Sequence, residues 1–136
     1  MDAIPARRWW RRWFGARAER AAERFLVKKG YRILKRNFVC PLGELDLVAL
    51  DGQEVVFVEV RSTQSEDPDR AAASVDARKQ HRLTNLALFF LRKNRLLDRA
   101  ARFDVLSVNW PENHGEPEIH HHCRAFEASG DFQMYS

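Results

Sequence analysis

The sequence predicts an α/β domain in which helices flank a mixed sheet of about five strands. Two segments, Ala16–Lys29 and Ala71 to about Leu97, carry apolar residues at helical spacing. Between them lie runs rich in apolar and β-branched residues, two of which are joined by the hairpin signal Asp51-Gly52. Two further β-rich runs follow the second helix. The predicted order is helix, three strands, helix and two strands, which is typical of a sheet with helices packed on it.

The first helix is expected to end at a glycine. Apolar residues recur on one face of Ala16–Lys29, and basic residues occupy most of the remainder. Gly30 follows this run, at the position where a helix-ending glycine is favoured. Tyr31–Val39 then alternates in part between apolar and polar residues, which predicts a strand.

The next two strands are expected to form a hairpin. Glu44–Leu50 and Gln53–Arg61 are β-rich and flank the Asp51-Gly52 turn. Val55–Val58 is apolar on both faces, so we expect the second of these strands to lie in the centre of the sheet.

The second half of the chain begins with a polar, acidic segment, Thr63–Arg70, which predicts an exposed loop. The helix from Ala71 carries an apolar stripe of Leu83, Leu86, Ala87, Phe90 and Leu91. Strands are predicted over Arg102–Trp110 and Ile119–Phe126, with a turn between them at Pro111–Pro117.

A chain of 136 residues is long enough for one domain with its own core. We place this domain at residues 15–127, after a basic aromatic extension at 1–14 and before a tail at 128–136. No apolar run is long enough to cross a membrane, and the extension lacks the features of a signal peptide. Two cysteines without close spacing suit a reducing compartment, so a cytoplasmic protein without a membrane partner is expected.

Positive charge is concentrated near the start of the chain. Arg7–Arg36 contains twelve Arg or Lys residues and two acids, whereas the remaining residues contain eleven Arg or Lys and seventeen acids. A concentrated basic segment attracts polyanions through counterion release, so Arg17 and Arg36 are candidate nucleic-acid contacts. The alternative is a solvated helix face that only aids solubility.

The hairpin groups acidic side chains on one face of the sheet. If Asp51-Gly52 is a two-residue turn, Glu44 stands opposite Glu59 and Asp46 is a diagonal neighbour of Glu59. A loop two residues longer would place Asp46 directly opposite Glu59. Carboxylates opposed in this way repel each other, and a hard divalent cation such as Mg2+ would remove the repulsion. Arg61, two residues beyond Glu59, puts a positive charge beside the site. The alternative is an exposed hairpin face with ordinary salt bridges.

Four other features have more than one interpretation. Glu19 can turn toward the sheet or pair with a neighbouring Arg or Lys in solvent. Lys79 can contact a phosphate or only extend along the helix to reach water. The run from His120 to Cys123 suggests a zinc site or a polar edge strand. The tryptophans and arginines of residues 9–14 can stack on bases, lie at a membrane interface or cap the core.

Five blocks of sequence, taken in order, resemble the YraN family of uncharacterised bacterial proteins. These blocks are Gly15–Glu19, Gly30–Asn37, Gly43–Val48, Val56–Arg61 and Arg102–Val105. That family looks like a branch of the restriction-endonuclease-like superfamily, related to archaeal Holliday-junction resolvases. The resemblance runs from about residue 15 to residue 126.

The resemblance implies a PD-(D/E)xK-type nuclease core that binds Mg2+ or Mn2+ and hydrolyses DNA. Asp46 and Glu59 match the acidic ligands, and Glu19 matches the helix glutamate of resolvase-like members. Arg61 stands at the position of the motif's lysine, where it can stabilise charge but is a poor general base. Leu45 stands where the motif has proline. Alternatives are a catalytically silent nucleic-acid-binding module and a protein-interaction domain, and relatives of this fold often form homodimers.

Overall fold

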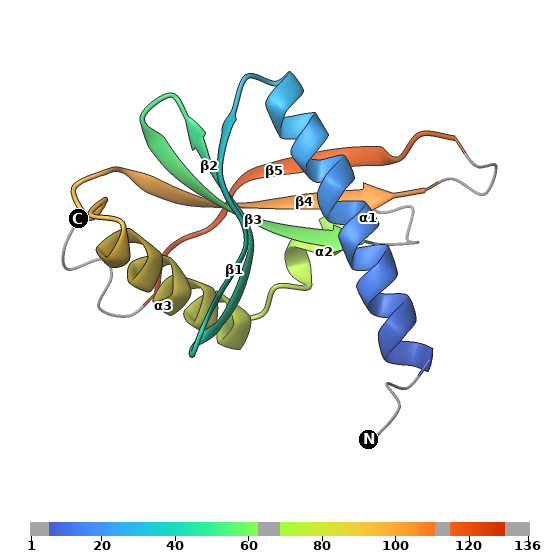
Figure 1. The fold of residues 1–136 in the computed structure, drawn as a ribbon, viewed down its shortest axis with the longest axis horizontal. Coiled ribbons are helices and arrows are strands. Elements are labelled where there is room, and N and C mark those ends of the chain that lie inside the picture. Colours follow the sequence, from blue (N-terminus) through green and yellow to red (C-terminus); the bar gives the residue numbers. More distant parts are fainter. Residues whose placement is uncertain (1–5, 63–68, 111–114, 130–136) are drawn as a thin grey trace.

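The computed structural model describes the backbone of residues 6–62, 69–110 and 115–129, and the side chains of these residues from 15 onward, Asp69 excepted. The helices are α1 (Ala6–Lys28), α2 (Asp69–Ala73) and α3 (Ala77–Lys93). The strands are β1 (Arg32–Cys40), β2 (Gly43–Asp51), β3 (Glu54–Ser62), β4 (Ala101–Asn109) and β5 (Glu118–Phe126). Figure 1 shows this arrangement of helices around one twisted sheet.

The five strands form one mixed sheet in the order β1-β2-β3-β4-β5. The first three strands pair antiparallel, β3 and β4 pair parallel, and β4 and β5 pair antiparallel. A parallel pair needs a crossover connection, and α2 and α3 lie in it. The predicted α/β fold class and order of elements are confirmed, as is the central position of β3.

A hydrophobic core covers each face of the sheet. One core packs α3 against the sheet and contains, among others, Phe38, Leu45, Val48, Phe57, Leu86, Phe90 and Phe103. The other packs α1 and contains Ala18, Ala22, Leu26, Leu47, Val56, Val58, Leu106 and Val108. Each strand supplies residues to both cores because successive side chains point to opposite faces. α1 and α3 therefore cover opposite faces of the sheet (Figure 1).

Two helix boundaries differ from the prediction. α1 begins at Ala6, ten residues before the predicted start, because the extension continues the helix. The long helix predicted from Ala71 was wrong: α2 ends at Ala73 and a new helix starts at Ala77. Asp76 caps this second helix, its carboxylate accepting a hydrogen bond from the Lys79 N–H at 2.8 Å. An aspartate at this position competes with the backbone for hydrogen bonds and favours a helix start over a helix interior.

Several predicted features lie outside the described residues. They include the loop at 63–68, the turn at 111–114, the tail from 130 onward and the side chains of the N-terminal tryptophans. Within the described part of the chain, no helix is both long and apolar enough to cross a bilayer.

Gly30 ends α1 as the sequence predicts. Its φ is +97°, its N–H donates to the Val27 carbonyl at 3.0 Å, and the Tyr31 N–H donates to the Leu26 carbonyl at 3.0 Å. This is the pattern of a glycine cap, and an alanine there would be strained.

Two Gly→Ala variants of α1 are therefore expected to change stability in opposite directions. Gly30→Ala should lower the free energy of unfolding by about 1 kcal/mol or more. Gly15→Ala should raise it by about 0.5–1 kcal/mol, because Gly15 lies within the helix and an added Cβ meets no atom of a described residue within 4 Å. Denaturant unfolding of both variants measures this, and equal effects would contradict the cap.

Candidate metal centre

The β2–β3 pairing ends just before Asp46 and Glu59. Asp51 pairs with Glu54 and Leu47 with Val58, and Asp46 and Glu59 are the next residues on the two strands beyond this last pair. The turn is centred on Gly52 and Gln53, so the predicted Asp51-Gly52 turn was wrong by one residue. This shift of the turn gives the same register as the longer loop that the sequence analysis offered as the second possibility, although the loop itself is not longer.

Asp46 is held at the point where the β2–β3 ladder ends. Its Oδ2 accepts a hydrogen bond from the Val60 N–H at 3.0 Å, so the side chain satisfies a backbone group of the neighbouring strand. A short acidic side chain can do this while its second oxygen keeps its capacity to accept. The carboxylate is therefore fixed beside β3 near Glu59.

Glu59 is buried, with 8% of its surface exposed, and lies next to two cations. Its Oε1 is 3.5 Å from the Lys79 Nζ, which comes from the first turn of α3. The same oxygen is 3.5 Å from the Arg61 Nε. Arg61 Nε is itself buried and makes no hydrogen bond to any described residue. The end of β3 therefore carries one acid between a lysine and an arginine.

Asn37 connects the helix acid to the hairpin. With its amide oriented to donate, the Asn37 nitrogen lies 2.8 Å from Glu19 Oε2 and 3.1 Å from Glu44 Oε1. Asn37 has a φ of +48°, in the left-handed region that asparagine tolerates better than most residues. Sequence reasoning missed this residue, and no local pattern distinguishes it.

The acids of this cluster share one electrostatic environment. The pKa of Asp46 is raised to about 7 by burial, by the negative charge of Glu59 and, less strongly, by that of Glu19. The Val60 hydrogen bond and the charge of Lys79 oppose this rise. Burial raises the pKa of Glu19 as well, followed by the charges of Glu44 and Glu59. At neutral pH the cluster therefore favours an added proton or cation.

The three predicted ligands do not converge to coordination distance. Among the described residues, one group of three Asp, Glu, His or Cys side chains has its ligand atoms within 4.8 Å of one another. This group is Asp104, His121 and Cys123, and it contains none of the predicted ligands. Glu19 is held by Asn37, Asp46 by the Val60 N–H, and Glu59 by its two cations. Carboxylates repel one another, and each of these acids is stabilised by a partner of its own.

The Asp104 cluster is better explained as a structural network. Asp104 is fully buried and accepts hydrogen bonds from Arg102 Nε at 3.0 Å, His121 Nε2 at 2.7 Å and the Arg124 N–H at 3.0 Å. Lys29 Nζ lies 2.9 Å from the other ring nitrogen of His121. Two cations and a satisfied carboxylate leave little for a metal ion to bind. Arg102, which organises this network, was not identified from the sequence.

The four predicted nucleic-acid contacts fall in three places. Arg61 and Lys79 flank Glu59. Arg36 pairs with Glu23 across α1 and β1. The guanidinium of Arg17 lies over the Trp110 ring, 4.7 Å from its centroid. The structure thus places Arg61 and Lys79 beside Glu59, and it places Arg36 in the small pocket that Glu19 and Glu23 also line. Arg17 lies apart from these acids, on the side of α1 that faces Trp110.

Fold and site together define a small α/β protein with a carboxylate cluster and two flanking cations at the end of its central strand. Residues 18–108 match the model of the uncharacterised protein family UPF0102, and the chain belongs to that family. This is the same family as YraN, so the resemblance is confirmed.

The relatives match along most of their length. A UPF0102 protein of Moorella thermoacetica is 48% identical over 98 residues, covering 72% of this chain and 82% of the relative. Proteins of the same description from Geotalea uraniireducens and Pelotomaculum thermopropionicum are each 42% identical. These alignments cover 83% and 85% of this chain and 88% and 97% of the relatives.

Proposed function

We propose that this protein is a divalent-metal-dependent nuclease that hydrolyses phosphodiester bonds, with DNA as its substrate. The observation that carries the proposal is the position of Asp46 next to Glu59 just beyond the last β2–β3 pair, with Glu19 in the same electrostatic environment and Lys79 and Arg61 beside Glu59. Carboxylates grouped without enough positive charge to neutralise them fit a hard divalent cation.

The acids would hold the metal and the cations would hold the substrate. Asp46, Glu59 and Glu19 offer oxygen ligands to Mg2+ or Mn2+, which when bound supplies a Lewis acid for the scissile phosphate. The guanidinium of Arg61 can donate hydrogen bonds to phosphate oxygens. Its Nε, buried without a hydrogen bond to a described residue, is a donor that a phosphate could satisfy.

Lys79 supplies the lysine ammonium that β3 lacks, because Arg61 occupies the position of the motif's lysine on that strand. In PD-(D/E)xK proteins the lysine stands on the strand at the position of Arg61, whereas here α3 brings a lysine to the same glutamate. A lysine is a compact donor that can contact a phosphate or a water molecule. The capped start of α3 holds its backbone in place.

The proposal is tested by incubating the purified chain with plasmid, single-stranded and four-way-junction DNA, with Mg2+ or Mn2+ and with EDTA. Cleavage should require the metal and fall to background in Glu59→Gln, which keeps the shape of the side chain but removes its charge. Lys79→Met should reduce cleavage by about ten-fold or more through loss of one charge-assisted contact. Arg92→Gln, an exposed cation at the far end of α3, serves as the control.

The outcomes distinguish three functions. Metal-dependent cleavage lost in Glu59→Gln supports the nuclease, and cleavage that survives in this variant indicates a contaminant. Salt-sensitive DNA binding without cleavage would make the protein a binding module. One observation favours this second candidate. Lys79 and Arg61 already pair with Glu59, and an acid that is neutralised by two cations has less need of a metal ion. Failure to bind DNA would leave a protein-interaction domain.

A further inference from the structure

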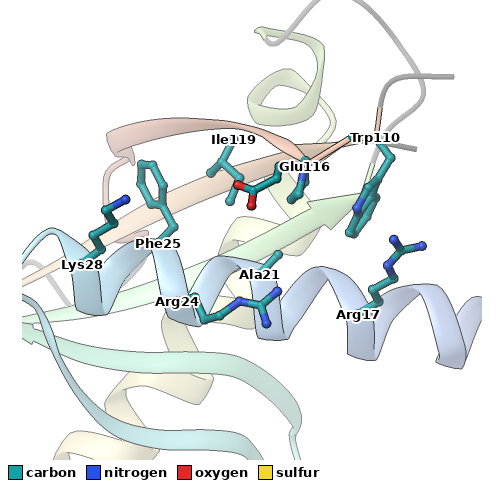
Figure 2. A pocket seen from close by; sticks show the side chains of 10 residues that line it. Arg17, Ala21, Arg24, Phe25, Lys28, Trp110, Glu116 and Ile119 are labelled. Carbon is teal, nitrogen blue, oxygen red and sulfur yellow. The ribbon is translucent and has the colours of Figure 1, made fainter. Parts of the chain in front are cut away.

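A second candidate site lies on the side of α1 away from the acids. It is a surface pocket of about 680 Å3 between α1, the end of β4 and the start of β5. This volume is in the range of small-molecule and nucleotide sites. Figure 2 shows Arg17 and Trp110 at one end of the pocket and Phe25 and Lys28 at the other.

One row of cations from α1 lines this pocket. Arg17, Arg24 and Lys28 are seven and four residues apart, which places them on one stripe of the helix. Glu19 and Glu23 instead line a smaller pocket toward β1, on the other side of α1. Within the described part of the chain, neither Arg24 nor Lys28 forms an ion pair, in contrast to Arg36 and Arg102.

The opposite wall of the pocket is aromatic and apolar. Trp110 follows β4 and is partly exposed, and Ile119 of β5 lies between it and Phe25. The Arg17 guanidinium over the Trp110 ring forms a stack that a nucleobase can extend. Glu116 is the one carboxylate among the described lining residues.

We propose that this pocket binds a single-stranded segment of nucleic acid, with phosphates on Arg24 and Lys28 and an unpaired base against Trp110. The choice of nucleic acid rests on the proposed function, but the site needs neither the metal nor the acids. Two cations without ion pairs among the described residues, Arg24 and Lys28, lie near an aromatic platform, and proteins bind single strands without reading their sequence through such an arrangement. A base must be unpaired to stack on Trp110, which excludes intact duplex from this contact.

The test is fluorescence anisotropy of a short labelled oligothymidylate in EDTA, as a function of salt. Arg24→Gln/Lys28→Gln should weaken binding and reduce the magnitude of the slope of log K against log salt by about 1.4, the loss of two phosphate contacts. Trp110→Leu should weaken binding by about ten-fold or more, whereas Trp110→Phe should retain most of it. Glu116→Gln should strengthen binding. The matched control is Lys35→Gln/Arg92→Gln, which removes two exposed cations elsewhere.

The outcomes are separable from those of the nuclease proposal. Loss of binding in the pocket variants but not in the control supports the site, whether or not the protein cleaves DNA. Equal affinity for single strand and duplex, with no effect of Trp110→Leu, would overturn it. Binding to phosphatidylserine vesicles that depends on Arg24 and Lys28, without oligonucleotide binding, would overturn it in favour of a lipid surface.

Discussion

Replacing Asp46 with asparagine is expected to abolish metal-dependent cleavage and to stabilise the metal-free protein at pH 8 by roughly 3 kcal/mol. The pKa of Asp46 is raised from 3.8 to about 7, chiefly by burial and by the charge of Glu59. The ionised carboxylate therefore destabilises the folded state at neutral and alkaline pH. Asparagine removes this charge and keeps an oxygen to accept the Val60 N–H.

The pH dependence of this effect has a definite sign. Because the folded-state pKa lies above the unfolded value, the folded protein binds more protons between pH 4 and pH 7, and its stability falls as the pH rises through this window. Asp46→Asn should therefore match the parent protein near pH 4 and exceed it at pH 8. Mg2+ or Mn2+ should stabilise the parent at pH 8 and have much less effect on the variant.

Thermal and denaturant unfolding at several pH values, with and without metal, measures both parts of this prediction. Asp98→Asn removes a carboxylate from an exposed position and is the control. A variant that is less stable than the parent at pH 8 would contradict the electrostatic description of the site. Undiminished stabilisation of the variant by metal would show that the ion binds elsewhere.

Asp104→Ala is expected to destabilise the protein by about 3 kcal/mol, because it leaves the buried Arg102 without its central partner. Arg102 is 8% exposed and donates to Asp104, Asp51, Glu54 and the Tyr31 hydroxyl. A buried guanidinium that loses a fully buried carboxylate keeps its desolvation cost without the compensating charge.

The matched control uses the same arginine. Asp51 lies 3.0 Å from Arg102 Nη1, but 46% of its side chain is exposed, so Asp51→Ala should cost about 1 kcal/mol or less. Denaturant unfolding at pH 7 compares the two variants, and equal losses would contradict the importance of burial.

Acid should diminish the effect of Asp104→Ala. Burial by itself would raise the pKa of Asp104, but hydrogen bonds from His121, Arg102 and the Arg124 N–H hold it below its usual value. The ionised carboxylate contributes its stability above the unfolded pKa of about 4, and this contribution is lost as the pH falls through the folded value. The difference between parent and variant should therefore shrink in strong acid.

Local patterns in the sequence determined the fold class and the order of the elements. Helical spacing identified α1 and α3, and alternation together with turn residues identified the strands. Gly30 marked the end of α1 because few other residues adopt its backbone conformation. Strand parity grouped Asp46 with Glu59 before any register was known, because two hairpin strands joined by a short turn can pair in only a few ways.

The tertiary structure decided which of these possibilities is realised. It fixed the register in which Asp46 and Glu59 follow the last β2–β3 pair, ended α2 before Asp76, and brought Lys79 from α3 to the end of β3. It also assembled the network around Arg102 and Asp104 from residues up to 92 positions apart. Contacts of this kind form when segments distant in the sequence pack together and replace their contacts with water. The periodicity of a single segment carries no information about which other segment it will contact.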